Sequence, residues 1–272
     1  KAEAKKKELE AFIARFSANL SKSRQATSRK KLLEKLNIEE IEPSTRRYPF
    51  VDFKISRECG NDILIVENLT KKPYFENLSF TVDKNDKIVF LSDNTLVTTT
   101  LFDVLMGKTK ADSGTIKWGV TITNDYMPGD NSEYFNKLGM NMCDWIRQYS
   151  GDEQTDTFVR GWLGRMLFSG DDVFKEVSVL SGGEKVRLML AKLMLSGANV
   201  ILLDDPSNHL DLETITSLNN GMIRYKGNLL FTSHDHEIIS TVANRVISFK
   251  NNEIIDRKMT YDEYLERFER EH

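Results

Sequence analysis

Two kinds of hydrophobic pattern divide the chain. Apolar residues from Leu9 to Leu20 recur at helical spacing, which predicts an amphipathic helix over residues 2–20. Ser28 is placed to cap a second helix, so the two segments together are predicted to form a helical hairpin or its distal part. Residues 37–60 contain prolines and are predicted to be an extended connector.

From residue 62 onward, short apolar or β-branched runs alternate with helical patterns. Near-continuous apolar strands separated by helices are typical of a buried, mostly parallel sheet, which predicts an α/β fold. Residues 134–178 carry helical signals instead. The runs at 62–82 and 245–256 are predicted to be hairpins of an antiparallel subsheet. Other strands are expected at 88–91, 199–203 and 229–233, and helices at 100–107, 184–196, 213–224 and 236–243.

Charge is distributed unevenly along a chain of ordinary globular composition, 40% apolar and 29% charged. Residues 1–36 contain eleven Lys/Arg and four Asp/Glu, which leaves 27 Lys/Arg against 37 Asp/Glu in the remainder. A basic arm on an acidic body predicts an anionic partner for the arm alone.

The cysteines and the apolar runs indicate the compartment. Cys59 and Cys143 are far apart and are predicted to be free thiols, with a disulfide as the less favoured alternative. No apolar run approaches the ~18–20 residues of a membrane span, so no membrane partner is expected and a cytoplasmic location is predicted. The chain begins at Lys1 within a helical pattern, which predicts a piece of a longer protein.

Two motifs are the most specific features of the sequence. LSGGEKVR occupies 180–187, and ILLDDPSNHLD occupies 201–211. The first places two glycines at a helix start, where backbone N–H groups can bind an anion. The second ends an apolar strand in two carboxylates. Together they resemble the signature motif and the Walker B/D-loop of ATP-binding cassette (ABC) ATPases.

The particular residues of these motifs resemble those of the ABC-F class, and most closely those of its YbiT-like subgroup. FIARFSAN at 12–19, QATSR at 25–29 and RMLFSG at 165–170 are similar to segments of that subgroup. The resemblance implies a basic helical linker over 1–48 and an ABC cassette over 49–272, with a helical subdomain at about 130–182. Such a cassette has a RecA-like P-loop ATPase core and an antiparallel β subdomain.

The phosphate-binding loop departs from the family pattern. Residues 92–100 read SDNTLVTTT where GxxxxGKS/T is expected, so Thr98 stands at the lysine position. Asn94, Thr99 and Thr100 match, and Thr99 keeps the hydroxyl that the resemblance assigns to Mg²⁺. A β-branched residue such as Val97 resists the positive φ that glycine adopts. ATP and Mg²⁺ are therefore expected to be weakly held here, and the alternative is a plain strand–helix turn.

The resemblance assigns further roles around this loop. Asp204 matches the carboxylate that holds Mg²⁺ through water, and Asp205 replaces the glutamate that polarises the attacking water. His234 matches the switch histidine, and Tyr74 is a candidate for stacking on adenine. The switch glutamine expected near 126–129 is missing, and Gly129 occupies the nearest matching position.

The signature residues, in contrast, are intact. Ser181, Gly182, Gly183 and Glu184 start a predicted helix, and in the family this turn closes over ATP held by another cassette. The chain is therefore expected to complete the ATP site of a partner cassette while hydrolysing little or no ATP itself. His209, in the D-loop, is expected to be a packing or interface residue.

The resemblance implies a ribosome-associated translation factor whose linker contacts rRNA and tRNA. Two alternatives remain open, the nucleotide-binding subunit of an ABC transporter and a pseudo-ATPase that acts as an interaction scaffold. The basic residues predicted to contact RNA lie around the presumed bend of the hairpin and are Lys22, Arg24, Arg29, Lys30 and Lys31.

Overall fold

The structure, a computed structural model, describes residues 47–250 and 253–269. The chain divides into two compact units, Lys1–Arg47 and Tyr48–His272, and the second contains nearly all of the described residues. The two predicted linker helices and the five basic residues assigned to RNA lie outside the described residues. In the described part, no helix has both the length and the apolar content needed to span a membrane.

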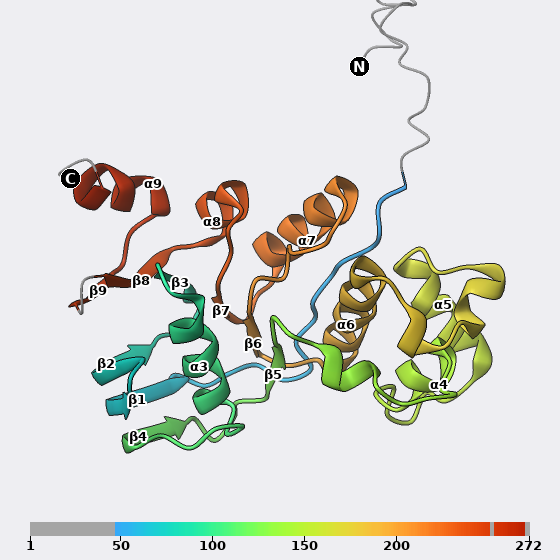
Figure 1. The fold of residues 1–272 in the computed structure, drawn as a ribbon, viewed down its shortest axis with the longest axis horizontal. Helices are drawn as coiled ribbons and strands as arrows, with labels where there is room; N and C mark the ends of the chain where they lie inside the picture. The colour runs from blue at the N-terminus through green and yellow to red at the C-terminus, as the bar shows by residue number, and fades with distance from the viewer. Residues whose placement is uncertain (1–46, 251–252, 270–272) are drawn as a thin grey trace, which may run out of the picture. The chain divides into compact units, whose positions relative to one another are not determined.

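A six-stranded sheet forms the centre of the second unit (Figure 1). Its strands pair in parallel except for the last pair, β8 and β9, which is antiparallel. This arrangement confirms the predicted α/β fold. The strand order is β5 (Asn124–Met127), β6 (Val200–Leu203), β7 (Asn228–Phe231), β3 (Lys87–Ser92), β8 (Arg245–Lys250) and β9 (Glu253–Arg257).

The near-continuous apolar runs of the central strands are explained by two cores, one on each face of the sheet. In β6, Val200 and Leu202 belong to one hydrophobic cluster, while Ile201 and Leu203 belong to the other. Successive side chains of a strand point to opposite faces, so both sets must be apolar when both faces are covered. Each such side chain contributes about 1.5–3 kcal/mol on burial.

A separate three-stranded antiparallel sheet corrects one prediction. It has the order β2 (Phe75–Val82), β1 (Leu64–Lys71) and β4 (Ser113–Trp118). The early hairpin was predicted to be part of it, but the late hairpin β8–β9 extends the six-stranded sheet instead. The third strand, β4, escaped prediction because its residues are mostly polar and exposed, and pairing with β1 holds it in place.

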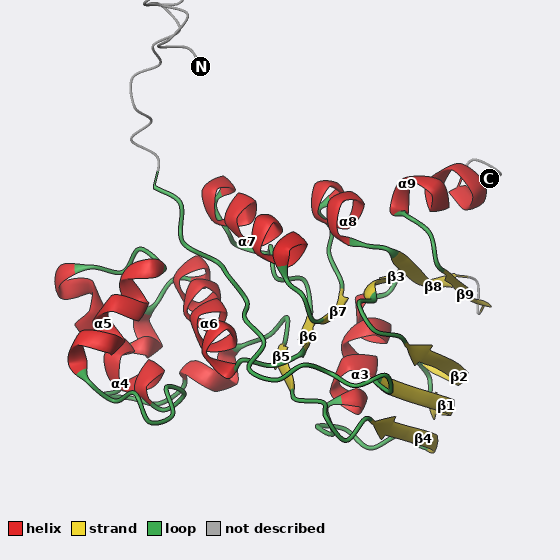
Figure 2. Ribbon diagram, turned by 180° about the vertical axis from the view of Figure 1, so that it is seen from behind, coloured by secondary structure: helices red, strands yellow, loops and turns green. Residues whose placement is uncertain are grey.

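Helices cover the two faces of the large sheet. Helix α3 (Thr95–Leu105) lies between the two sheets, where Phe102 meets Phe90 edge-on at 5.4 Å between ring centroids. The other face is covered by α6 (Gly182–Ser196), α7 (Leu212–Arg224) and α8 (His236–Val242). Figure 2 shows this division from behind. The short α9 (Tyr261–Tyr264) and a π-helical turn (Leu265–Glu269) follow β9.

Between β5 and α6 the chain forms a helical segment without strands. It contains α4 (Met142–Arg147), α5 (Asp156–Arg165) and three 3₁₀ turns, η1 (Ser132–Phe135), η2 (Gly170–Phe174) and η3 (Val177–Val179). Trp145 is fully buried there, whereas Trp162 is only partly buried and donates from its indole to the Ala191 carbonyl at 3.0 Å. Cys59 and Cys143 are both free, as predicted, and both are buried.

Candidate functional site: a cavity at the sheet edge and the first turn of α6

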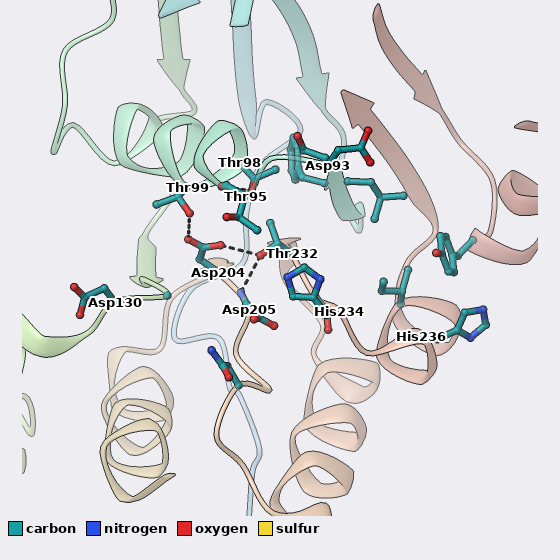
Figure 3. A pocket seen from close by; sticks show the side chains of 18 residues that line it. Asp93, Thr95, Thr98, Thr99, Asp130, Asp204, Asp205, Thr232, His234 and His236 are labelled. Atoms are coloured by element: carbon teal, nitrogen blue, oxygen red, sulfur yellow. Dashed lines mark hydrogen bonds between the residues drawn. The ribbon is translucent and has the colours of Figure 1, made fainter. Parts of the chain in front are cut away.

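A cavity of about 890 Å³ lies at the carboxyl ends of β3, β6 and β7 (Figure 3). Ligands of open α/β sheets bind at this edge. The cavity brings together most of the predicted residues of the cassette's own site. Its polar lining includes Asp93, Thr95, Thr98, Thr99, Asp130, Asp204, Asp205, Asn208, Thr232 and His234.

The segment expected to be a phosphate loop is mostly helix. Helix α3 begins at Thr95, so Thr98, Thr99 and Thr100 are helical residues, and the predicted start at residue 100 was wrong. All of residues 92–100 are described, and none of them has a positive φ. A glycine loop visits left-handed conformations, whereas this sequence has no glycine and instead supplies a good N-cap, Asn94.

The amides at this helix start are used internally. The side chain of Asn94 accepts from the Leu96 amide at 3.0 Å, and its carbonyl accepts from the Val97 amide at 3.0 Å. The amide of Asn94 donates to the Ser92 hydroxyl at 3.2 Å. The Thr98 hydroxyl donates to the Thr95 carbonyl at 3.0 Å, so it too is directed at the chain itself. These groups are not available to a phosphate as the amides of a glycine loop are.

Asp204 is buried, and each of its carboxylate oxygens accepts a hydrogen bond from a hydroxyl group. Thr99 Oγ1 donates to Asp204 Oδ2 at 2.6 Å, and Thr232 Oγ1 donates to Asp204 Oδ1 at 2.8 Å. Thr232 also accepts from the Asp205 amide at 2.8 Å and so links the two carboxylate residues (Figure 3). Thr232 was not predicted, because a hydroxyl residue after a strand carries no distinctive signal. Its hydroxyl orients the carboxylate of Asp204 through the oxygen Oδ1.

The backbone conformation at position 205 favours an aspartate. Asp205 lies at φ +46°, in the left-handed region. Asp and Asn adopt this region more readily than longer side chains do. Its carboxylate receives a long hydrogen bond from Ser207 at 3.5 Å. An aspartate therefore suits this turn, although its side chain is one methylene shorter than the glutamate of the family.

His234 and His236 lie at different places. His234 is exposed, follows β7 and lines the cavity near Thr232. His236 begins α8, and its ring meets Tyr261 at 5.2 Å while Nδ1 is 3.1 Å from the Ser240 hydroxyl. Both histidines line the cavity, but His236 is engaged with Tyr261 and Ser240, whereas His234 lies beside the two carboxylate residues.

The cavity is acidic. Four aspartates line it, Asp93, Asp130, Asp204 and Asp205, and no lysine or arginine of the described residues does so. Opposite charges near a phosphate stabilise it and like charges repel it, most strongly where water is excluded. The start of α3 has bonded amides at Asn94, Leu96 and Val97, and the cavity has no described cation to balance its aspartates, so its lining differs from that of a glycine phosphate loop.

Two further predicted positions lie around this cavity. Tyr74 is half-buried and lines a second cavity of about 680 Å³ with Phe249 and Ile254. The two cavities share Ser92 and Asp93 in their linings. Gly129, where the switch glutamine is missing, approaches the aspartate pair, since a Cβ placed on it would lie 3.3 Å from an Asp204 carboxylate oxygen.

The signature turn is built differently. Ser181 caps α6, and its hydroxyl accepts from the Glu184 amide at 3.3 Å while Glu184 Oε2 accepts from the Ser181 amide at 2.8 Å. Burial opposes ionisation of Glu184, but hydrogen bonds from Ser181 and nearby cations outweigh it and lower its pKa. Among the described residues, no hydrogen-bond partner occupies the amides of Gly182 and Gly183.

His209 explains why both signature positions are glycine. A Cβ on Gly183 would lie 2.8 Å from the His209 carbonyl oxygen, and one on Gly182 would lie 3.3 Å from His209 Cβ. His209 itself has φ +63°. The D-loop therefore packs directly on the first turn of α6, as the packing role predicted for His209 requires. Residues 181–184 do not line the acidic cavity.

Comparison with known proteins agrees with this geometry. The ABC transporter family matches residues 75–208, and a second family with the same description matches residues 1–53. Solved cassettes share the fold. One, a dimer in a post-hydrolysis state with ADP and Pi, is 14% identical with a TM-score of 0.60 and covers 72% of this chain and 99% of that one. The chain thus contains an ATP-binding domain of the ABC transporter family.

Curated relatives extend the comparison along nearly the whole chain. The ABC transporter ATP-binding protein YkpA of Bacillus subtilis is 58% identical over 96% of this chain and 49% of its own length. The probable ATP-binding protein YbiT of Escherichia coli O157:H7 is 40% identical over 95% of this chain and 49% of its length. The energy-dependent translational throttle protein EttA of Escherichia coli K12 is 31% identical over 76% and 39%. The chain therefore spans about half the length of YkpA and YbiT.

Proposed function

We propose that this chain is the linker and second cassette of an ABC-F protein of the YbiT-like subgroup. In this proposal its own nucleotide site is vestigial, and its signature turn completes an ATP site held by the first cassette. The observation that carries the proposal is the contrast within one domain between the self-bonded start of α3 and the open glycine amides of α6.

The signature turn would act by electrostatics. The amides of Gly182 and Gly183 lie at the positive end of a 15-residue helix, which favours a phosphate in front of them. ATP on the partner cassette would supply the phosphoryl chemistry. Donors fixed in advance stabilise charge that develops in a transition state without reorganising. The capping box of Ser181 and Glu184 holds the turn in that geometry.

A pair of variants in the complete two-cassette polypeptide tests the proposal. Ser181→Arg fills the turn that faces the partner's ATP, and we expect turnover to fall about 10²-fold or more, the size expected for loss of fixed donors. Thr98→Ala changes the vestigial site, and we expect turnover within about twofold of wild type. Phosphate release under saturating ATP measures both. A larger loss for Thr98→Ala than for Ser181→Arg would show that the roles are reversed.

The relatives favour a ribosomal rather than a transport role for the proposed protein. EttA is named a translational throttle, and other relatives are ABC transporter F family members of Arabidopsis thaliana. The basic residues at 22–31 would then contact rRNA or tRNA phosphates, and the protein would work in the cytoplasm where ribosomes are found. Arg and Lys at such a surface contact phosphates with little reading of bases.

Salt dependence tests the RNA contact separately. Each phosphate contact that is lost lowers the slope of log K against log salt by about 0.7–0.9. We expect a variant with all five basic residues changed to Ser to bind ribosomes more weakly at low salt and with a shallower slope. Co-sedimentation across a salt series measures both quantities. An unchanged affinity together with an unchanged slope would identify the arm as a spacer.

A further inference from the structure

The segment that follows Gly129 is held by two lysines. The ring of Tyr134, in η1, has Lys108 Nζ 5.6 Å and Lys192 Nζ 5.8 Å from its centroid. Lys108 follows α3, and Lys192 lies near the end of α6. Cations within about 6 Å of a ring centroid are attracted to its face, and more strongly when they are removed from water. One tyrosine therefore lies against lysines from two different elements.

Lys192 makes a buried ion pair with the central sheet. The residue is 8% exposed, and its Nζ lies 2.7 and 3.0 Å from the carboxylate oxygens of Asp125 in β5. It also lies 5.3 Å from the Tyr149 ring centroid. A buried pair adds little net stability over apolar packing, but it fixes the register of the elements it joins, because misalignment leaves a charge unpaired. Here it fixes α6 relative to β5.

Lys108 holds the same segment from the other side. It forms an ion pair with Glu133 of η1 and lies 5.4 Å from the Tyr126 ring centroid in β5. Burial disfavours its charge, but the hydrogen bond to Glu133 and the neighbouring acidic groups outweigh burial, so the pKa of Lys108 is raised. Lys108 is therefore a charged contact at all physiological pH values.

The η1 turn passes this restraint on to the helical segment. The Tyr134 carbonyl accepts from the Trp145 indole at 2.7 Å, and Phe135 stacks on Trp145 at 5.1 Å with an interplanar angle of 17°. Trp145 belongs to α4 and is fully buried. The chain of contacts runs from the sheet through the lysines and Tyr134 to α4.

We propose that Lys108 and Lys192 are positioning residues that hold the helical segment and α6 against the sheet without any nucleotide. The consequence for the signature turn rests on the proposed function, whereas the restraint itself does not. The signature end of α6 is then held in one position, whether or not a ligand occupies the chain's own acidic cavity.

Amide hydrogen exchange on the 272-residue chain tests the restraint directly. The variant Lys192→Met with Asp125→Asn removes both charges, so that no unpaired charge is left at this site. We expect amides in residues 132–165 to exchange about tenfold faster or more, with β7 and β8 unchanged. In wild type, ATP with Mg²⁺ should leave the protection of residues 132–165 unchanged. Nucleotide-dependent protection there, or an equal rise throughout the domain, would overturn the inference.

Two controls separate positioning from general stability. Arg245→Met removes another buried cation, which is bonded to Asp86 and Asp256 at the opposite side of the sheet. We expect it to speed exchange across the whole domain rather than in residues 132–165 alone. Lys258→Met removes an exposed ion pair with Asp83. It should leave exchange unchanged both in residues 132–165 and in the rest of the domain. A selective effect of Arg245→Met on residues 132–165 would contradict the assignment of the lysines.

The consequence for the signature is measured in the complete two-cassette polypeptide. We expect Lys192→Met with Asp125→Asn to lower kcat about tenfold and to change KM for ATP less than twofold, because the turn would be misplaced rather than removed. An unchanged kcat, in a protein where Ser181→Arg lowers turnover about 10²-fold or more, would overturn the positioning role. If Ser181→Arg itself has no effect, the proposed function fails while the exchange result stands.

Discussion

The helices α3 and α6 begin at the two motifs of this domain that resemble nucleotide-binding motifs. Their first turns differ in whether the backbone amides already have hydrogen-bond partners. At α3, Asn94 uses its side chain and its carbonyl to bind the amides of Leu96 and Val97. At α6, Ser181 and Glu184 bind each other's amides, and no partner among the described residues takes those of Gly182 and Gly183. A helix start can therefore bind an anion only if its sequence leaves amides unused.

The difference comes from residues with and without a Cβ. Gly182 and Gly183 leave room for the backbone of His209, whereas Val97 buries its side chain in the core around α3. The first turn of α3 gains burial through Val97, but its amides are bonded within the chain. The first turn of α6 buries no side chain at its two glycines, and among the described residues their amides have no partner. We expect this contrast to affect the rate of ATP hydrolysis most, the free energy of unfolding less, and the pH dependence of that free energy least.

The largest expected effect is on catalysis by the chain alone. We expect the isolated 272-residue chain to hydrolyse ATP about 10³-fold or more below the ~1 s⁻¹ of an ordinary ATPase. The loop amides are engaged, the lysine is missing and the cavity is lined by four aspartates. Phosphate release measures the rate. Turnover near ~1 s⁻¹ that is abolished by Asp204→Asn would show that the acidic cavity is a working site.

Introducing a glycine at the start of α3 and removing one at the start of α6 should both destabilise the domain, for different reasons. Val97→Gly would restore a glycine of the family pattern, yet we expect it to lower the free energy of unfolding by about 2–3 kcal/mol, through lost burial and a poorer helix former. Gly183→Ala adds a Cβ 2.8 Å from the His209 carbonyl oxygen. We expect that substitution to cost about 1–3 kcal/mol, because the D-loop must move.

Urea unfolding measures both substitutions, and the chain offers a matched control. Leu96 precedes Val97 and is 56% exposed, so Leu96→Gly carries the backbone cost with little loss of burial. We expect it to cost less than about 1 kcal/mol. If Val97→Gly were neutral, the first turn of α3 would be a loop in solution, and the contrast between the two helix starts would be lost.

The central strands and the signature could be predicted because their signals are local. Apolar residues at every position of β6 indicate burial on both faces, and a Ser followed by two glycines and Glu184 indicates a capped helix. The start of α3 is also encoded locally, since Asn94 is a good N-cap, but alignment with the glycine-loop pattern predicted a helix start at residue 100 instead.

Other features depend on tertiary contacts that sequence does not show. Strand β4 is polar and exists because it pairs with β1. Thr232 bridges Asp204 and Asp205 across 28 and 27 residues of chain, and Lys192 meets Asp125 across 67. Neither hydroxyl nor lysine carries a pattern that distinguishes a bridge from a surface residue.

The smallest expected effect concerns the charge that holds the signature turn. The pKa of Glu184 is lowered in the folded chain, so its stabilising contribution is present above the ordinary carboxyl pKa. That contribution is lost as pH falls through the lower, folded-state pKa. Glu184→Gln keeps a capping-box acceptor but removes the charge beside the positive end of α6. We expect it to reduce the free energy of unfolding by about 0.3–1 kcal/mol at neutral pH.

Urea unfolding of wild type and Glu184→Gln at neutral pH and at progressively more acidic pH measures this effect. The difference between the two proteins should shrink as pH falls through the lowered pKa of Glu184, because the wild-type carboxyl then becomes neutral as well. Glu58→Gln, at an exposed acid outside the helices, should show no comparable difference at any of these pH values. A Glu184→Gln difference that stays constant with pH would mean that the geometry of the capping box, rather than its charge, keeps the glycine amides in place.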